Sequence, residues 1–149
     1  LDFAAEPAGY DVVLCIGATF ALGGLEPAVA WMRRAMKADG VMAIGEVFAA
    51  EKPFPLQERH PEPPDLAATV QIFDRAGLEL TALLAASPDD WDRYQSRQWH
   101  AVHEWAAANP AHPLRTQALE RIRANRAAYF AWERRCFGWA IFVLRPRPA

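Results

Sequence analysis

Two apolar segments, separated by a stretch with helical character, constrain the fold of this chain. Residues 10–16 read Tyr-Asp-Val-Val-Leu-Cys-Ile, and residues 41–48 read Val-Met-Ala-Ile-Gly-Glu-Val-Phe. Their length and their Val and Ile content predict strands buried on both faces. Between them, Pro27 suits the first turn of a helix, and Gly40 is predicted to end that helix in the left-handed conformation. The helix would bury one stripe, formed by Leu25, Val29, Met32 and Met36.

A strand, a helix and a second strand in this order predict a βαβ unit. Such units almost always cross over right-handed within a parallel sheet. Ligands of open α/β sheets bind beyond the carboxyl ends of the strands. The segments 16–20 and 46–48 therefore become the first candidates for function.

The rest of the chain continues with helices and strands. Asp65 can cap a helix that runs to Gly77, and residues 78–86 form a third apolar strand segment. The sequence Ser-Pro-Asp-Asp at 87–90 is typical of a helix start with a capping box. We expect helices from there to Asn109 and over 114–135, with Tyr94 and Phe130 among their inward residues, and a last strand at 138–144. Five prolines within residues 53–64 predict a stiff loop that covers the strand ends.

These segments resemble the second half of the class I S-adenosylmethionine-dependent methyltransferases. In that family a Y/F-D-V-V strand is followed by a helix, a Leu-x-Pro-Gly-Gly-like turn and the next strand. Here the strand is Tyr10-Asp11-Val12-Val13, and the turn is a degenerate Met36-Lys37-Ala38-Asp39-Gly40 that keeps one glycine. Residues 73–80 are similar to the next helix-Gly-strand step, and residues 138–144 to the antiparallel last strand. The resemblance implies an α/β, Rossmann-like methyltransferase sheet, represented by its C-terminal half.

The resemblance covers residues 2–86 and 138–144 and leaves 88–135 as a helical insertion, interpreted as a lid or substrate element. The family's glycine-rich turn, which holds the methionine part of the cofactor, has no counterpart in this sequence. We therefore interpret residues 1–149 as a single partial domain whose missing part precedes Leu1. On this hypothesis the chain alone neither binds S-adenosylmethionine tightly nor catalyses methyl transfer.

The resemblance implies some site residues, and the position and chemistry of others make them further candidates. The backbone of Ile16, Gly17, Ala18 and Thr19 would line the methionine part of the cofactor. Glu46, at the end of its strand, could orient a substrate or act as a base, or it could be a solvent-exposed strand end. Tyr94 is the second catalytic candidate because its hydroxyl could reach a polar substrate group. The substrate-binding candidates are Phe20, Phe48, Trp91 and Trp99, although aromatic residues at helical spacing, such as the two tryptophans, are more often helix core.

Composition and charge exclude several other classes. The net charge is −2, with 52% hydrophobic residues, which argues against a disordered tail. No apolar run approaches the roughly 20 residues of a membrane helix, and no signal peptide is visible, so we expect a cytoplasmic protein. His100 and His103 share a helix face without a second ligand pair, and the arginines of 115–135 are spread around their helix. We therefore expect no metal site and no nucleic-acid partner.

The expected partner is a small-molecule methyl acceptor; the oligomeric state is left open. Two alternatives to methyl transfer remain. One is the C-terminal part of a nicotinamide-dependent Rossmann enzyme, against which a final antiparallel strand would argue. The other is a non-catalytic module that pairs with a partner through its aromatic helices.

Overall fold

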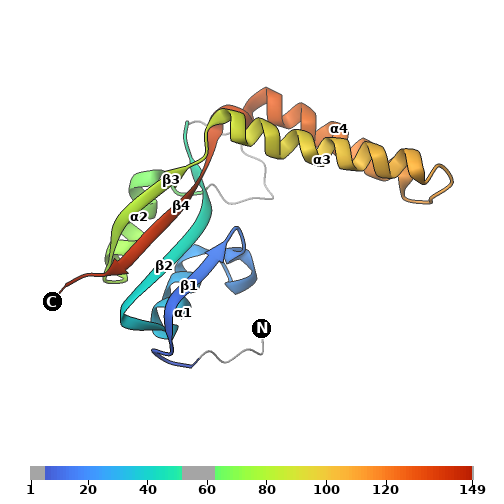
Figure 1. Cartoon of the computed structure of the whole chain (residues 1–149). Helices are drawn as coiled ribbons and strands as arrows, with labels where there is room; N and C mark the ends of the chain where they lie inside the picture. The colour runs from blue at the N-terminus through green and yellow to red at the C-terminus, as the bar shows by residue number, and fades with distance from the viewer. Residues whose placement is uncertain (1–5, 52–62, 149) are drawn as a thin grey trace.

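Four strands form one mixed sheet in the order β1-β2-β4-β3 (Figure 1). β1 (Tyr10–Ile16) pairs parallel with β2 (Met36–Ala49). β4 (Phe137–Pro146) lies antiparallel between β2 and β3 (Leu78–Ala85). The carboxyl ends of β1, β2 and β3 consequently meet at one end of the sheet. The predicted βαβ unit and the antiparallel last strand are both confirmed.

The computed structural model describes residues 6–51 and 63–148. Asp2 and residues 53–62 of the predicted proline-rich loop lie outside these ranges. None of the described helices is both long enough and apolar enough to cross a membrane. The cytoplasmic location stays a prediction.

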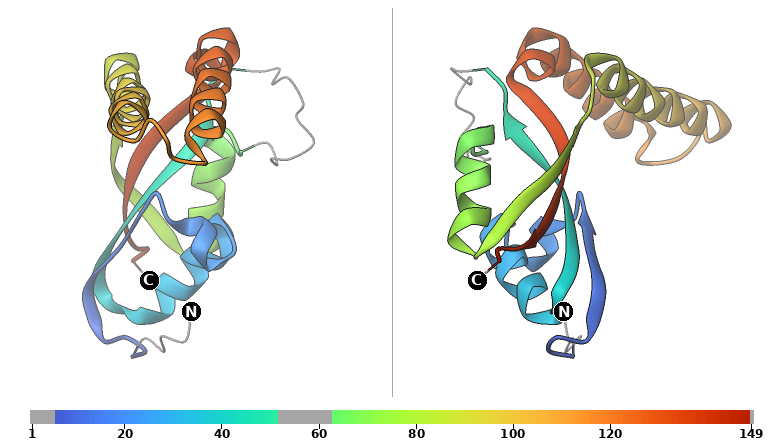
Figure 2. Two further views of the ribbon diagram at one scale, coloured as in Figure 1. Left: turned by 90° about the vertical axis from the view of Figure 1, so that its right-hand side faces the viewer. Right: turned by 60° about the vertical axis from the view of Figure 1, so that its left-hand side comes forward.

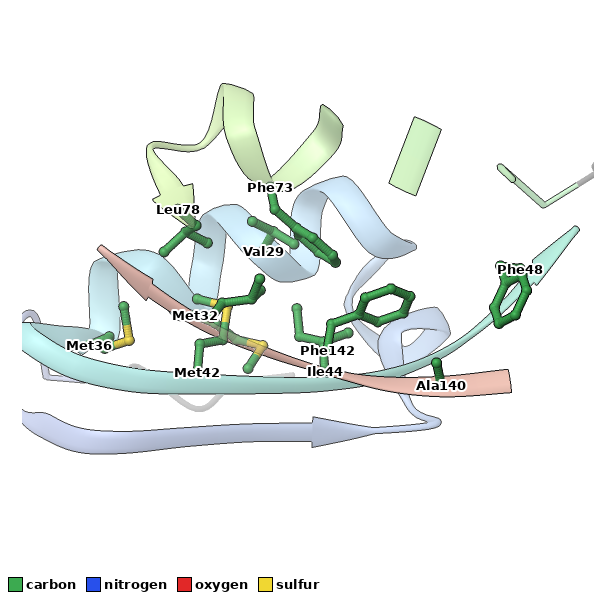
Figure 3. Packing of buried hydrophobic residues seen from close by; sticks show 11 residues of the cluster. Val29, Met32, Met36, Met42, Ile44, Phe48, Phe73, Leu78, Ala140 and Phe142 are labelled. Atoms are coloured by element: carbon green, nitrogen blue, oxygen red, sulfur yellow. The ribbon is translucent and has the colours of Figure 1, made fainter. Parts of the chain in front are cut away.

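Helices α1 (Leu25–Ala35) and α2 (Leu66–Arg75) cover one face of the sheet (Figure 2). A short 3-10 helix, η1 (Thr19–Leu22), joins β1 to α1. The Asp65 carboxylate caps α2 by accepting the Ala68 N–H at 2.8 Å, as predicted. Buried side chains of both helices and of the sheet meet in a single core (Figure 3); among them are Val29, Met32, Met42, Ile44, Phe73, Leu78, Phe142 and Leu144.

The opposite face of the sheet carries apolar side chains, and no helix within residues 6–51 and 63–148 lies across it (Figure 2). We call it the uncovered face. On β1, Val12 and Leu14 are 56% and 65% exposed, while Val13 and Cys15 pack against the core. The prediction that residues 10–16 are buried on both faces is therefore wrong. β1 is an edge strand, and α1 shields only one of its faces.

A helical hairpin projects from the carboxyl end of the sheet (Figure 1). It consists of α3 (Pro88–Ala108) and α4 (Arg115–Ala128). The predicted capping box is confirmed, since Ser87 Oγ accepts the Asp90 N–H and Asp90 Oδ2 accepts the Ser87 N–H at 3.0 Å. After α4 the chain forms the π-helical turn η2 (Tyr129–Glu133) and the short α5 (Arg134–Cys136), which leads into β4.

Three side chains fasten the root of this hairpin, and we call them the root clamp. Asp92 accepts the Tyr129 hydroxyl at 2.6 Å and two N–H groups of Arg134 at 2.8 and 2.9 Å. These hydrogen bonds, from Arg134 first and then Tyr129, lower the pKa of Asp92 to about 2. Burial, followed by the bond to Asp92, raises the pKa of Tyr129 to about 12. The clamp therefore stays ionised at Asp92 and protonated at Tyr129 near neutral pH.

Element boundaries differ from the prediction around residue 36. α1 ends at Ala35, and Met36 begins β2 with an extended backbone (φ −81°, ψ 138°). Met36 is buried in the core as predicted, but it reaches the core from β2 and not from the helix. Gly40 is not a left-handed stop: a Cβ there would lie 2.6 Å from Met36 Cγ and 3.0 Å from the Asp11 carbonyl oxygen, so the glycine is required by close packing.

Three residues predicted to point inward are exposed. Phe130 is 63% exposed because the π-helical turn shifts the helical phase after Ala128. Leu84, which strict alternation along the strand would place on the same side as the buried Leu78, is 56% exposed because a register shift between Leu80 and Ala82 turns the end of β3. Tyr94 is 59% exposed and lines a cavity described below.

Candidate functional site

A cavity of about 800 Å³ lies where the carboxyl ends of the three parallel strands meet the first turns of α3. Its walls come from the ends of β1, β2 and β3, from the first half of β4, and from α3. Its place in the fold is the one expected for ligands of open α/β sheets.

Six of the predicted site residues line this cavity. They come from three elements far apart in the sequence: the segment after β1, the end of β2 and the start of α3. They are Ile16, Gly17, Phe20, Glu46, Trp91 and Tyr94.

The other four predicted residues do not line the cavity. Ala18 is half-buried in the turn before η1, and Thr19 is buried. Phe48 is 8% exposed and belongs to the core, where its ring fills the space beside Gly138. Trp99 packs within the hairpin, edge-on to Tyr129 with the ring centroids 5.7 Å apart.

Glu46 is held in place by two hydrogen bonds. Its Oε2 accepts the hydroxyl of Thr19, and its Oε1 accepts the N–H of Val47 at 2.9 Å. Thr19 therefore acts on the site through Glu46, in addition to the backbone role expected for it. Within residues 6–51 and 63–148, no Lys, Arg or His forms a salt bridge with Glu46. The carboxylate is thus oriented, and no cation from the described residues pairs with it.

Two glycines shape the floor of the cavity for different reasons. Gly17 has φ +67°, a backbone conformation that residues with a Cβ rarely adopt. Nothing lies within 4 Å of the position that a Cβ would take there. Its N–H donates to the Gly45 carbonyl at 2.8 Å, which fixes the turn after β1. Gly45 instead makes room for a ring: a Cβ there would lie 2.7 Å from Cζ2 of Trp139 and 3.0 Å from Ile16.

The first turns of α3 supply an acidic and aromatic wall. Asp90 and Tyr94 line the cavity together with Trp91, whose ring meets that of Tyr94 edge-on at a centroid distance of 5.9 Å. Hydrogen bonds from Ser87 lower the pKa of the Asp90 carboxyl, so it remains ionised at neutral pH. Asp90 also contacts Arg93 at 3.3 Å, on the exposed surface of the helix.

Sequence reasoning missed the contribution of β4 and β3. Trp139 and Ile141 line the cavity, as does Leu84. The alternation within β4 held a signal: Ala140, Phe142 and Leu144 are fully buried in the core, so their neighbours must point to the opposite face. That face could not be linked to the site without the pairing of β4 with β2.

Neither the Cys15 thiol nor a cluster of possible metal ligands adds reactive chemistry to the part of the chain that the structure describes. Burial raises the pKa of the Cys15 thiol, and the nearby Glu46 carboxylate adds to the effect, which leaves the thiol protonated and weakly reactive. In the parts of the chain that the structure describes, no three His, Cys, Asp or Glu side chains come together in a way that could hold a metal ion.

The fold is shared with solved methyltransferases, although no protein-family model matches the chain. It superposes on a S-adenosylmethionine-dependent methyltransferase from Geobacter sulfurreducens in complex with S-adenosylhomocysteine, with a TM-score of 0.86 at 25% identity over 97% of the chain. A methyltransferase from Thiobacillus denitrificans, in complex with the same molecule, gives a TM-score of 0.85 at 23% identity over 97% of the chain. The chain has the class I methyltransferase fold.

An uncharacterised relative shares the same methyltransferase fold. YjhP of Escherichia coli is 28% identical over 95% of the chain, and its crystal structure gives a TM-score of 0.84. The chain spans 61% of each of the two methyltransferases and 63% of the solved YjhP chain. The chain thus spans about three fifths of the length of these proteins.

Proposed function

We propose that the full-length protein transfers a methyl group from S-adenosylmethionine to a small-molecule acceptor. The superposition on methyltransferases in complex with S-adenosylhomocysteine carries this proposal. The cavity at the carboxyl ends of the parallel strands supports it. The antiparallel β4, inside the sheet, favours a methyltransferase over a nicotinamide-dependent enzyme.

The residues present fit part of the cofactor's site. The open space over Gly17 leaves room for a bound molecule to approach the backbone of residues 16–18. When bound, S-adenosylmethionine supplies an activated methyl group, so the protein mainly positions the acceptor and receives its proton. Glu46, which Thr19 orients at the same cavity, is our candidate for the group that accepts this proton.

The hairpin of residues 88–135 is our candidate substrate element. Its first turns place Trp91 and Tyr94 in the cavity wall, and the root clamp holds α3 to the segment that leads into β4. Tyr94 is an exposed residue, and its hydroxyl is proposed to contact a polar group of the acceptor. Trp99 would act only indirectly, by packing the two helices together.

We further propose that the 149-residue chain is inactive by itself. Its relatives are longer by about two fifths of their length, and the uncovered face leaves apolar side chains of β1 in water. A preceding segment that packs on this face would complete both the core and the cofactor site. Nucleic-acid partners are not expected, as predicted from the charge pattern.

The proposed function is tested by following S-adenosylhomocysteine formation by the full-length protein over a panel of small-molecule acceptors. We expect product formation with at least one acceptor class, a large loss of kcat in Glu46→Gln and a smaller loss in Tyr94→Phe. Absence of S-adenosylmethionine binding, together with a tight dimer in light scattering, would instead favour a non-catalytic interaction module.

A further inference from the structure

The charge of the cavity lining singles out one kind of ligand. Two carboxylates, Glu46 and Asp90, line the cavity, and none of its described lining residues is Lys, Arg or His. Asp90 forms a salt bridge with Arg93 and belongs to the capping box of α3. Glu46, in contrast, has no cationic partner among the described residues. A cavity with this lining attracts cations and repels anions.

The remaining lining suits the body of such a ligand. Four aromatic side chains, Phe20, Trp91, Tyr94 and Trp139, and several aliphatic ones face the same space. Aromatic rings attract an organic cation through their faces and also pack against its apolar part. The partial positive charge at the N-terminus of α3 opposes this attraction, but Asp89 and Asp90 lie in the first turn and offset it.

We propose that the acceptor is an organic amine that binds in its ammonium form, with the charged nitrogen at Glu46 and its apolar body against the four aromatic rings. One N–H proton then passes to Glu46, and the freed lone pair of the nitrogen forms the bond to the methyl group while S-adenosylhomocysteine leaves. The inference rests on the proposed methyltransferase function and specifies its substrate class. Thr19 is then a positioning residue, because its hydroxyl donates to Glu46 Oε2 and so orients the carboxylate.

Three probes that differ only in their terminal group test the proposal: 4-phenylbutylamine, 4-phenyl-1-butanol and 4-phenylbutyrate. They are titrated into the full-length protein by calorimetry. We expect the amine to bind at least about tenfold more tightly than the alcohol, which corresponds to about 1.4 kcal/mol, and the carboxylate to bind most weakly. Equal affinities, a preference for the carboxylate, or no binding of the amine would overturn the proposal.

Variants then locate the charge that selects the amine. Glu46→Gln should weaken amine binding about tenfold and change alcohol binding less than twofold. Glu79→Gln is the matched control, since Glu79 is an exposed carboxylate on β3 that does not line the cavity. Thr19→Val should lower amine affinity by a smaller factor, with alcohol affinity unchanged. A Glu46→Gln protein that still prefers the amine would contradict the assignment.

A parallel titration with S-adenosylhomocysteine separates this proposal from the proposed function. S-adenosylhomocysteine binding without amine selectivity overturns the acceptor class and leaves methyl transfer standing. Amine binding without S-adenosylhomocysteine binding would refute methyl transfer and would show that the cavity binds an organic ammonium ion without methylating it.

Discussion

Replacing Gly45 by alanine tests how the cavity floor is built. The new Cβ would lie 2.7 Å from Trp139 Cζ2, whereas ordinary van der Waals contact begins at 3.4 Å. Gly45 has an extended strand backbone that alanine adopts without strain, so the clash is the main cost. Overpacking a well-packed site destabilises a protein by about 1–3 kcal/mol. Replacing glycine by alanine also lowers the conformational entropy of the unfolded chain, which stabilises the folded protein by about 0.4–1 kcal/mol. We expect a net loss of about 1–2 kcal/mol.

Gly77→Ala provides a control of similar cost at a distant place. Gly77 has φ +71°, and nothing lies within 4 Å of its missing Cβ. Alanine there pays about 1–2 kcal/mol for the left-handed backbone without touching another side chain. The two variants should therefore lose similar stability in urea unfolding, while only Gly45→Ala moves the indole ring.

The position of the ring is followed by ¹⁹F NMR after labelling the six tryptophans with 5-fluorotryptophan. The Trp139 signal, assigned with Trp139→Phe, should shift in Gly45→Ala and stay in place in Gly77→Ala. An unshifted Trp139 signal in Gly45→Ala would contradict this prediction, because it would show that the strand backbone rather than the ring moves to admit the new Cβ.

Three further predictions concern the core, the hairpin cap and the root clamp. Phe73→Ala should cost about 3–5 kcal/mol because Phe73 is fully buried, whereas Phe20→Ala, at a site 80% exposed, should cost less than about 0.5 kcal/mol in urea unfolding. Ser87→Ala should lose about 1 kcal/mol with the capping box, and Ser96→Ala, in the middle of the same helix, should lose much less. Because the pKa of Asp92 is lowered to about 2, the stability that its ionised form supplies is complete above about pH 4 and disappears as the pH falls towards 2. The stability difference between the wild type and Asp92→Asn should therefore shrink over that range, and a difference independent of pH would contradict the clamp.

Local sequence signals predicted most of the fold. Capping residues such as Asp65 and Ser87 fixed the helix starts, because their oxygens meet N–H groups only a few residues away. The strand-helix-strand order implied a parallel pair, which the register of β1 with β2 confirms. Burial was harder to predict: the apolar residues of β1 suggest an inner strand, yet exposure depends on which elements lie beside it.

The site was predicted only in part, because the sequence shows where a strand ends but not which strand lies beside it. Strand ends pointed to Ile16, Gly17 and Glu46, and all three line the cavity. Trp139 was missed because its role depends on pairing across more than ninety residues of sequence, where Val47 and Trp139 face each other. Phe48 was predicted to contact substrate from its place at a strand end, but strand alternation puts its side chain into the core.

Calorimetry with S-adenosylmethionine distinguishes a partial cofactor site from a complete one. Because we propose that this chain supplies the acceptor side of a methyltransferase with only part of the cofactor site, we expect micromolar binding to the full-length protein and no measurable binding to residues 1–149 alone. Micromolar binding to the isolated chain would contradict the partial site, and absence of binding to the full-length protein would contradict the methyltransferase itself.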